Sequence, residues 1–129
     1  MREILFRGKG YSGEWFCGNL RISNLLNDPT DYVEILPINV GPPDFPTYER
    51  VQPETVGQYT GLLDKNGKKI FEGDIVNGAF SNGPAEIRMI LGAWVACRGK
   101  GWSDIGIKAN TLEVAGNIHD NPELMEGIL

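Results

Sequence analysis

The stretch PETVGQYTGLLDKNGKKIFEGDIV, residues 53–76, decides the fold of this chain. Its strongest local signal is Asp-Lys-Asn-Gly at 64–67, which lies between two runs of strand-forming residues. Asn-Gly readily takes both positive-φ positions of a type I′ turn, whose twist matches that of paired strands. The pattern predicts a hairpin that joins a strand at 58–62 to one at 69–71. A turn at 72–74 then leads into a buried strand.

Downstream of this stretch we expect further strands at 85–91, 93–98, 105–108 and 112–118. Short strands with turns roughly every 8–12 residues are typical of a small barrel. A strand entered through a Gly-Asp-Ile-Val corner is common in SH3-like barrels, by analogy of fold alone. Near the C-terminus, Asn121 offers an N-cap, Pro122 a first helical position and Glu123 an acidic first turn. These features predict one short C-terminal helix.

Upstream, residues 2–8 and 14–22 predict two strands, because aromatic and β-branched residues suit a half-buried pleated surface. A third strand is expected at 32–38. The three prolines of GPPDFP, at 41–46, withhold backbone donors, so this segment predicts an extended loop. The expected fold class is mainly β. Residues 1–52 form N-terminal strands with a Pro-rich loop, packed with a small SH3-like barrel and short terminal helix at 53–129.

The composition excludes several classes of protein. A 129-residue chain with 41% hydrophobic residues is not a disordered tail. The net charge of −5 argues against a general nucleic-acid coat protein, because such binding is mainly electrostatic. The first apolar run is too short for a secretory signal, and no apolar stretch approaches the roughly 18 residues of a membrane span. We therefore expect a cytoplasmic protein with no membrane partner.

The residues that most often carry catalysis or bind metals are few. Cys17 and Cys97 lie in apolar strand-like runs and predict buried reduced thiols rather than a disulfide. His119 is the one histidine, and a metal site would need further ligands at suitable spacing. Asp120 and Glu123 beside it suit a helix start, so capping or surface exposure is favoured. No third group is identifiable to orient a Cys–His pair, so we expect no metal and no such catalysis.

Other candidate sites also favour a structural interpretation. GKGYSG at 8–13 matches G-x-G-x-x-G, but nucleotide binding needs a helix that starts at this loop, and the residues that follow are strand-like. It predicts a flexible hairpin loop, and no cofactor is expected. Asp74 is expected to accept backbone amides at its turn. No pairing that would justify an acid/base dyad is evident among the glutamates at 54, 72, 86, 113, 123 and 126.

One candidate interaction surface remains, formed by Lys65, Asn66, Lys68, Lys69 and Trp102. A nucleic-acid face in a small barrel mixes basic and aromatic side chains. Such a face would add Arg98, Lys100 and Lys108, with Trp94, Tyr59 and Phe71 for stacking. The alternative, favoured by the acidic total charge, is that the lysines solvate a hairpin tip and the aromatic residues fill a core.

Residues 53–76, the ending EVAGNIHDNPELME at 113–126, and the opening MREILFRG with Trp15 and Gly-Asn-Leu at 18–20 resemble one family. This is the YopX family, small proteins of bacteriophages and bacterial prophages, especially in Gram-positive hosts. The resemblance implies an all-β fold with an SH3-like barrel in its C-terminal part, in the cytoplasm of a bacterial host. It carries no catalytic residues over. Residues 24–52 and 98–110 match loosely, so strand pairing there stays open, and 98–110 is interpreted as a variable loop.

Three functions are compatible with the sequence. The first is a phage accessory protein that acts as an interaction module, through homo-oligomerisation or a host or phage protein partner, since a small barrel presents loops and edges. The alternative is a nucleic-acid-binding module that uses the barrel face and the lysine hairpin. The third is an enzyme whose site would consist of carboxylates converging in a pocket.

Overall fold

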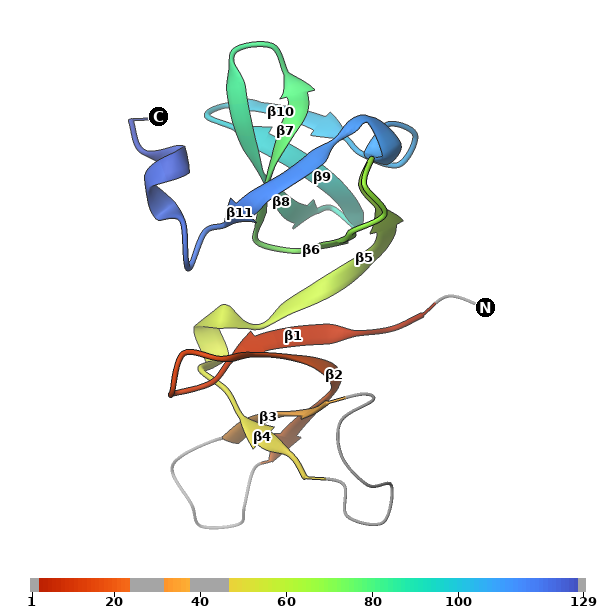
Figure 1. The fold of residues 1–129 in the computed structure, drawn as a ribbon. Coiled ribbons are helices and arrows are strands. Elements are labelled where there is room, and N and C mark those ends of the chain that lie inside the picture. The colour runs from red at the N-terminus through yellow and green to blue at the C-terminus, as the bar shows by residue number, and fades with distance from the viewer. Residues whose placement is uncertain (1–2, 24–31, 38–46, 128–129) are drawn as a thin grey trace. The chain divides into compact units, whose positions relative to one another are not determined.

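The computed structural model describes residues 3–23, 32–37 and 47–127, and within them it is mainly β, as predicted (Figure 1). The chain divides into two compact units, Met1–Gln58 and Tyr59–Leu129. The division falls inside strand β5 (Gly57–Leu63), whereas the sequence placed a boundary between residues 52 and 53. The loop predicted at 41–46 lies outside the described residues.

The first unit is an antiparallel sheet in the order β4-β3-β2-β1. Its strands are β1 (Phe6–Lys9), β2 (Trp15–Ser23), β3 (Tyr32–Pro37) and β4 (Glu49–Arg50). The first residues of β5 pair with β1, and Pro53–Thr55 form a 3-10 turn, η1. In this unit Ile35 on β3 and Val51, which directly follows β4, are fully buried.

The second unit contains a five-stranded antiparallel sheet in the order β10-β9-β8-β7-β11. Its strands are β7 (Asp74–Phe80), β8 (Gly83–Ile90), β9 (Ala93–Arg98), β10 (Gly101–Asp104) and β11 (Glu113–Asn117). The end of β5 pairs with β6 (Lys69–Phe71) as the predicted hairpin. The SH3-like barrel is not confirmed, because the sheet stays open, with β10 and β11 as its two edges among the described residues.

One apolar cluster holds the second unit together. The buried strand predicted after the turn at 72–74 is β7, and its Ile75 and Val76 are fully buried. Burying each such side chain stabilises the fold by roughly 1.5–3 kcal/mol. The cluster draws on strands and on the connection that follows β10, and consists of Ile70, Val76, Ala85, Ile87, Ala96, Ile105, Ala109 and Leu112.

Two predicted elements differ from the structure. The strand expected at 105–108 is wrong, because β10 occupies Gly101–Asp104, inside the segment interpreted as a variable loop. A two-residue turn at 99–100, with Gly99 at φ 58°, reverses the chain directly after β9 and starts the next strand early. At the C-terminus, Pro122–Met125 form only a 3-10 turn, η3, which packs against β8, so an α-helix is not confirmed.

Candidate functional site

The hairpin between β5 and β6 carries most of the predicted interaction surface. Gly67 has a φ of 78° and its N–H donates to the Asp64 carbonyl at 3.0 Å, while the Asp64 N–H donates to the Lys68 carbonyl at 2.8 Å. Asn66 is not among the residues with positive φ. The predicted two-residue type I′ turn is therefore wrong. The loop has three residues, a type I turn followed by a left-handed glycine.

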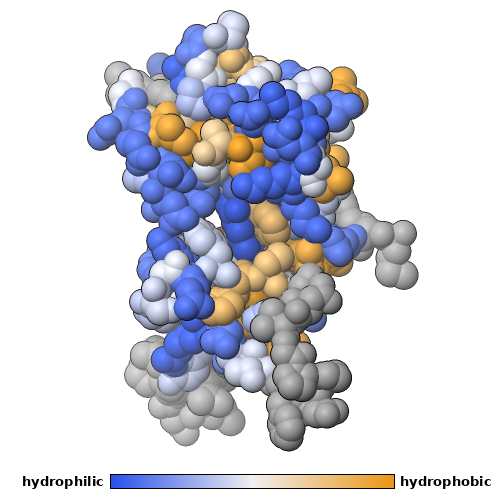
Figure 2. Space-filling view, in the orientation of Figure 1, coloured by the Kyte–Doolittle hydropathy of each residue, from blue (hydrophilic) through white to orange (hydrophobic). Residues whose placement is uncertain are grey.

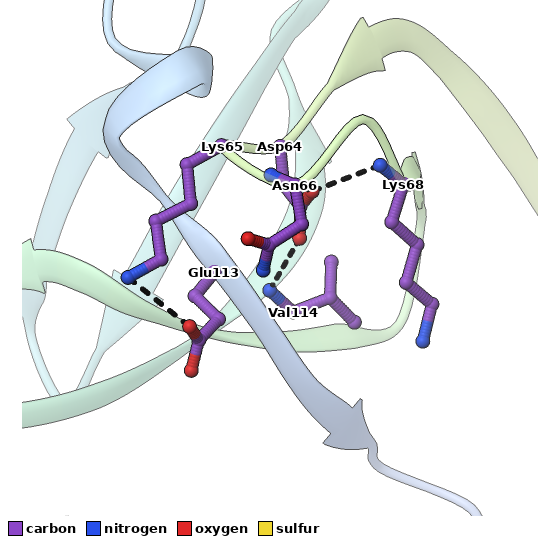
Figure 3. Close-up of polar contacts among 6 residues, drawn as sticks. All are labelled: Asp64, Lys65, Asn66, Lys68, Glu113 and Val114. Carbon is purple, nitrogen blue, oxygen red and sulfur yellow. Dashed lines mark hydrogen bonds and ion pairs between the residues drawn. The ribbon is translucent and has the colours of Figure 1, made fainter.

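Asp64 organises this loop, and the sequence analysis missed it. Its Oδ1 accepts hydrogen bonds from the N–H groups of Asn66 at 2.8 Å and Lys68 at 2.9 Å. Its Oδ2 accepts one from the N–H of Val114 at 3.0 Å (Figure 3). Burial raises the pKa of this carboxyl, but the three amides and the Lys68 charge outweigh burial, so the pKa of Asp64 is lowered. An Asp placed two residues before Asn-Gly is the available signal, because Asp side chains bond amides two residues on.

The hairpin is also bound to the chain just before and at the start of β11. The Lys65 N–H donates to the Leu112 carbonyl at 2.9 Å, and the Lys65 Nζ lies 3.1 Å from Glu113 Oε2 (Figure 3). Both side chains are about half exposed, so this ion pair contributes at most about 1 kcal/mol. The charge of Lys65 is nevertheless matched within the unit.

The five predicted surface residues do not all share one place. Lys69 Nζ lies 5.7 Å from the centroid of the Tyr59 ring, and Lys68 extends away from the Lys65–Glu113 pair (Figure 3). Trp102 lies on β10, at the opposite edge of the sheet from β11, and is 66% exposed. The other proposed stacking residues belong to packed regions: Tyr59 and Phe71 are buried, and Trp94 packs against the core.

The rejected catalytic candidates have structural roles. Asp74 is buried, and its Oδ2 accepts the Phe71 N–H at 2.8 Å, which confirms the predicted corner contact. The His119 N–H donates to Asn117 Oδ1 at 2.9 Å. Asn121, predicted as an N-cap, does not cap η3 with its side chain. Its Oδ1 instead accepts the Asn117 N–H at 3.2 Å. In the described ranges no group of three or more His, Cys, Asp and Glu could hold a metal.

Neither cysteine forms a disulfide. Cys97 is buried, whereas Cys17 is only partly so. Burial raises the pKa of the Cys97 thiol, Glu86 raises it further and Arg88 opposes both, which leaves the thiol protonated at neutral pH. Cys97 therefore packs on β9 as an apolar residue.

Gly8 and Lys9 of the GKGYSG segment end β1 and pair with β2, the rest of the segment lies in the predicted hairpin loop, and a strand follows it. The Gly10 N–H donates to the Glu14 carbonyl at 2.7 Å. A Cβ on Gly8 would lie 2.7 Å from Val51 Cγ2, a side chain with no exposed surface. Close packing against Val51 therefore accounts for this glycine without a phosphate.

A second exposed feature of the second unit was not predicted. Leu91 and Gly92 connect β8 to β9 with φ of 50° and 83°, so the type I′ geometry occurs here instead. Leu91 is 101% exposed and Ile107 is 96% exposed. The Ile105 N–H donates to the Trp94 carbonyl at 3.4 Å. Trp94 lies near the start of β9, so the chain that continues to Ile107 leaves β10 at the end of the sheet where Leu91 also lies. Figure 2 shows that apolar residues reach the surface among hydrophilic ones on the face in view.

Comparisons with known proteins cover nearly the whole chain. A family model described as YopX protein matches residues 6–126. The crystal structure of protein EF1440 from Enterococcus faecalis matches with a TM-score of 0.57 and 25% sequence identity, over 98% of this chain and 100% of that one. No curated protein matches the chain. No helix in the described part is long and apolar enough to cross a membrane.

Proposed function

The chain belongs to the YopX family, and on that premise we propose that it is an accessory protein of a bacteriophage or prophage that acts by binding protein in the bacterial cytoplasm. The second unit supplies the binding surface. Its polar clusters are engaged in internal contacts, as the Asp64 and Asp74 carboxylates are. The apolar residues at its surface are the groups that another protein would cover.

Leu91 carries this proposal. A left-handed conformation costs roughly 1–2 kcal/mol for an L-residue that is not glycine. The Leu91 side chain is also fully exposed, so it recovers none of that cost by burial in the fold. Burial of a leucine against a partner yields roughly 1.5–3 kcal/mol. Asn or Gly would suit this turn better but would offer no apolar side chain. Leu91 therefore supplies an apolar group that a partner protein can bury.

Affinity capture from lysates of bacteria that carry a related prophage tests the proposal. The full chain is compared with Leu91→Asn, which suits the turn and so preserves the fold. Ile22→Thr is the matched control, because Ile22 is 66% exposed and lies on β2 in the first unit. We expect identified proteins to be retained by wild type and Ile22→Thr and lost with Leu91→Asn. Identical sets from all three proteins would contradict the proposal.

The nucleic-acid alternative has weaker support. Lys65 is paired with Glu113, and in the first unit the guanidinium carbons of Arg21 and Arg50 already lie 3.6 Å from the ring centroids of Tyr48 and Tyr32. These rings therefore have one face occupied before any base could stack on them. Binding to short DNA or RNA at low salt tests this alternative, because phosphate contacts strengthen there.

A further inference from the structure

The two edge strands of the five-stranded sheet differ in whether side chains bind their outward-facing backbone amides. On β11, Asp64 Oδ2 accepts the Val114 N–H at 3.0 Å, and Asn121 Oδ1 accepts the Asn117 N–H at 3.2 Å. Side chains thus occupy amides that an added strand would need. Blocking of this kind is how sheet edges avoid pairing with another chain. β11 is therefore a closed edge.

In the part of the chain that the structure describes, β10 lacks this protection along its outer side. Gly101 pairs with Arg98 across a two-residue turn, and the Ile105 N–H donates to the Trp94 carbonyl at 3.4 Å. Backbone groups alternate in direction along an antiparallel pair, so odd-numbered residues here bond β9. Trp102 and Asp104 consequently direct their N–H and C=O groups away from β9. Both residues are exposed, and β9 is the one strand that pairs with β10 within the described ranges.

We propose that β10 pairs antiparallel with β10 of a second copy of this chain, about a two-fold axis at Trp102. The pairing goes beyond the proposed function, because it adds a second copy of the chain as a partner at β10 rather than at the Leu91 turn. It places each Trp102 opposite the other, and it sets each Lys100, in the turn directly before β10, beside Asp104 of the second copy. The sequence Lys-Gly-Trp-Ser-Asp at 100–104 is in this sense self-complementary.

Charge, rather than backbone direction, selects this register. Outward-facing residues pair with outward-facing residues for a two-fold axis at Gly101, Trp102 or Ser103. An axis at Gly101 sets Lys100 opposite Trp102, and an axis at Ser103 sets Trp102 opposite Asp104. Of these three registers, the axis at Trp102 is the one that sets opposite charges directly opposite, and it does so twice. The resulting contact is isologous, as in most homodimers. A four-residue edge buries less than the roughly 1,200 Å² of a stable interface, so the dimer is reversible and concentration-dependent.

Sedimentation velocity of the full chain over a wide concentration range tests the pairing. Lys100→Glu alone sets the new carboxylate against Asp104 of the second copy, and Asp104→Lys alone sets two cations together. We expect each variant to weaken association by about tenfold or more. Mixing the two variants pairs opposite charges at both positions, so association returns to near the wild-type level. Lys68→Glu, the same charge change on the hairpin, should leave association unchanged.

Asp104 also accepts the Gly106 N–H at 2.7 Å, so Trp102→Thr serves as a second variant that keeps this contact and a strand-forming residue. It too should weaken association. A wild-type chain that stays monomeric at the highest concentration, or a mixture that fails to restore association, would overturn the pairing. A monomeric chain that still loses captured proteins with Leu91→Asn would overturn the pairing alone and leave the protein-binding function standing.

Discussion

The Asp64 carboxylate joins the β5–β6 hairpin to β11, because its Oδ2 accepts the Val114 N–H at 3.0 Å from 50 residues away in the chain. The same carboxylate closes the hairpin loop through the amides of Asn66 and Lys68. One buried side chain therefore fixes a local turn, a distant contact and the closed edge of the sheet. Hydrogen bonds, rather than catalytic chemistry, explain why an acid lies there.

Replacing Asp64 by Ala should be strongly destabilising. Three backbone amides lose their acceptor, and each amide left unsatisfied away from water costs roughly 1–3 kcal/mol. We expect the free energy of unfolding to fall by about 3 kcal/mol or more, measured by urea denaturation. Lys65→Ala removes only the exposed pair with Glu113 and should cost less than about 1 kcal/mol. Equal losses for the two variants would contradict the role assigned to Asp64.

Asp64 should also make stability depend on pH. Its pKa in the folded chain is below the ordinary value of 3.8, so the unfolded chain binds the proton more tightly. The stabilisation is therefore complete above about pH 5 and is lost as the pH falls through the lowered folded pKa. The difference in unfolding free energy between wild type and Asp64→Asn should be constant near neutral pH and shrink below about pH 4. If the difference in unfolding free energy instead grew on acidification, the pKa of Asp64 would be raised rather than lowered by folding, which would contradict this account.

Leu91→Asn should stabilise the second unit. Asparagine enters the left-handed region more readily than leucine, so the change relieves roughly 1 kcal/mol of backbone strain. Leu91→Ala is the control, because alanine also disfavours this region and should leave stability close to wild type. Thermal unfolding followed by circular dichroism measures both. If Asn and Ala had the same effect, the turn would not be strained.

Alanine substitutions at Gly18 and Gly13, both in the first unit, compare the cost of a steric overlap with the cost of an unfavourable backbone conformation. A Cβ on Gly18 would overlap the Leu36 carbonyl oxygen, whereas one on Gly13, at φ 95°, would meet open space. Gly13→Ala should therefore cost only about 1 kcal/mol of strain. Gly18→Ala should cost about 3 kcal/mol or more, because the backbone of β3 must move. A smaller loss of thermal stability with Gly18→Ala than with Gly13→Ala would show that β3 yields easily.

The sequence predicted those elements whose own residues determine them. Strands β2, β3, β5, β8 and β9 follow from aromatic and β-branched runs, and the corner at Asp74 follows from its position before the buried Ile75. The hairpin was predicted in the right place but with the wrong turn. Asp64, not the Asn-Gly pair alone, determines the geometry of the turn. The Val114 N–H, which donates to Asp64 Oδ2, helps to hold the Asp64 side chain in place.

The remaining errors have physical causes that are not local. Asn121 has every feature of an N-cap, yet its side chain lies against Gly116, where a Cβ would overlap Asn121 Oδ1. A contact with β11 therefore overrides the helix start. Leu91 was assigned to a strand because apolar residues usually lie in buried strands, and only the structure shows it exposed at a turn. The position of β10 likewise depends on the tight turn at 99–100, which pairs β10 with β9, rather than on the strand propensity of its residues.

The most specific claim about this protein is that a second copy of the chain covers β10, and amide hydrogen exchange tests it most directly. The exchange rates of the Trp102 and Asp104 amides are measured at low and high protein concentration. The amides of Val114 and Asn117 serve as internal references, because Asp64 and Asn121 already bind them. We predict that protection of Trp102 and Asp104 rises with concentration while the references stay constant. Fast exchange at Trp102 and Asp104 at every concentration would contradict the claim that a second copy covers β10.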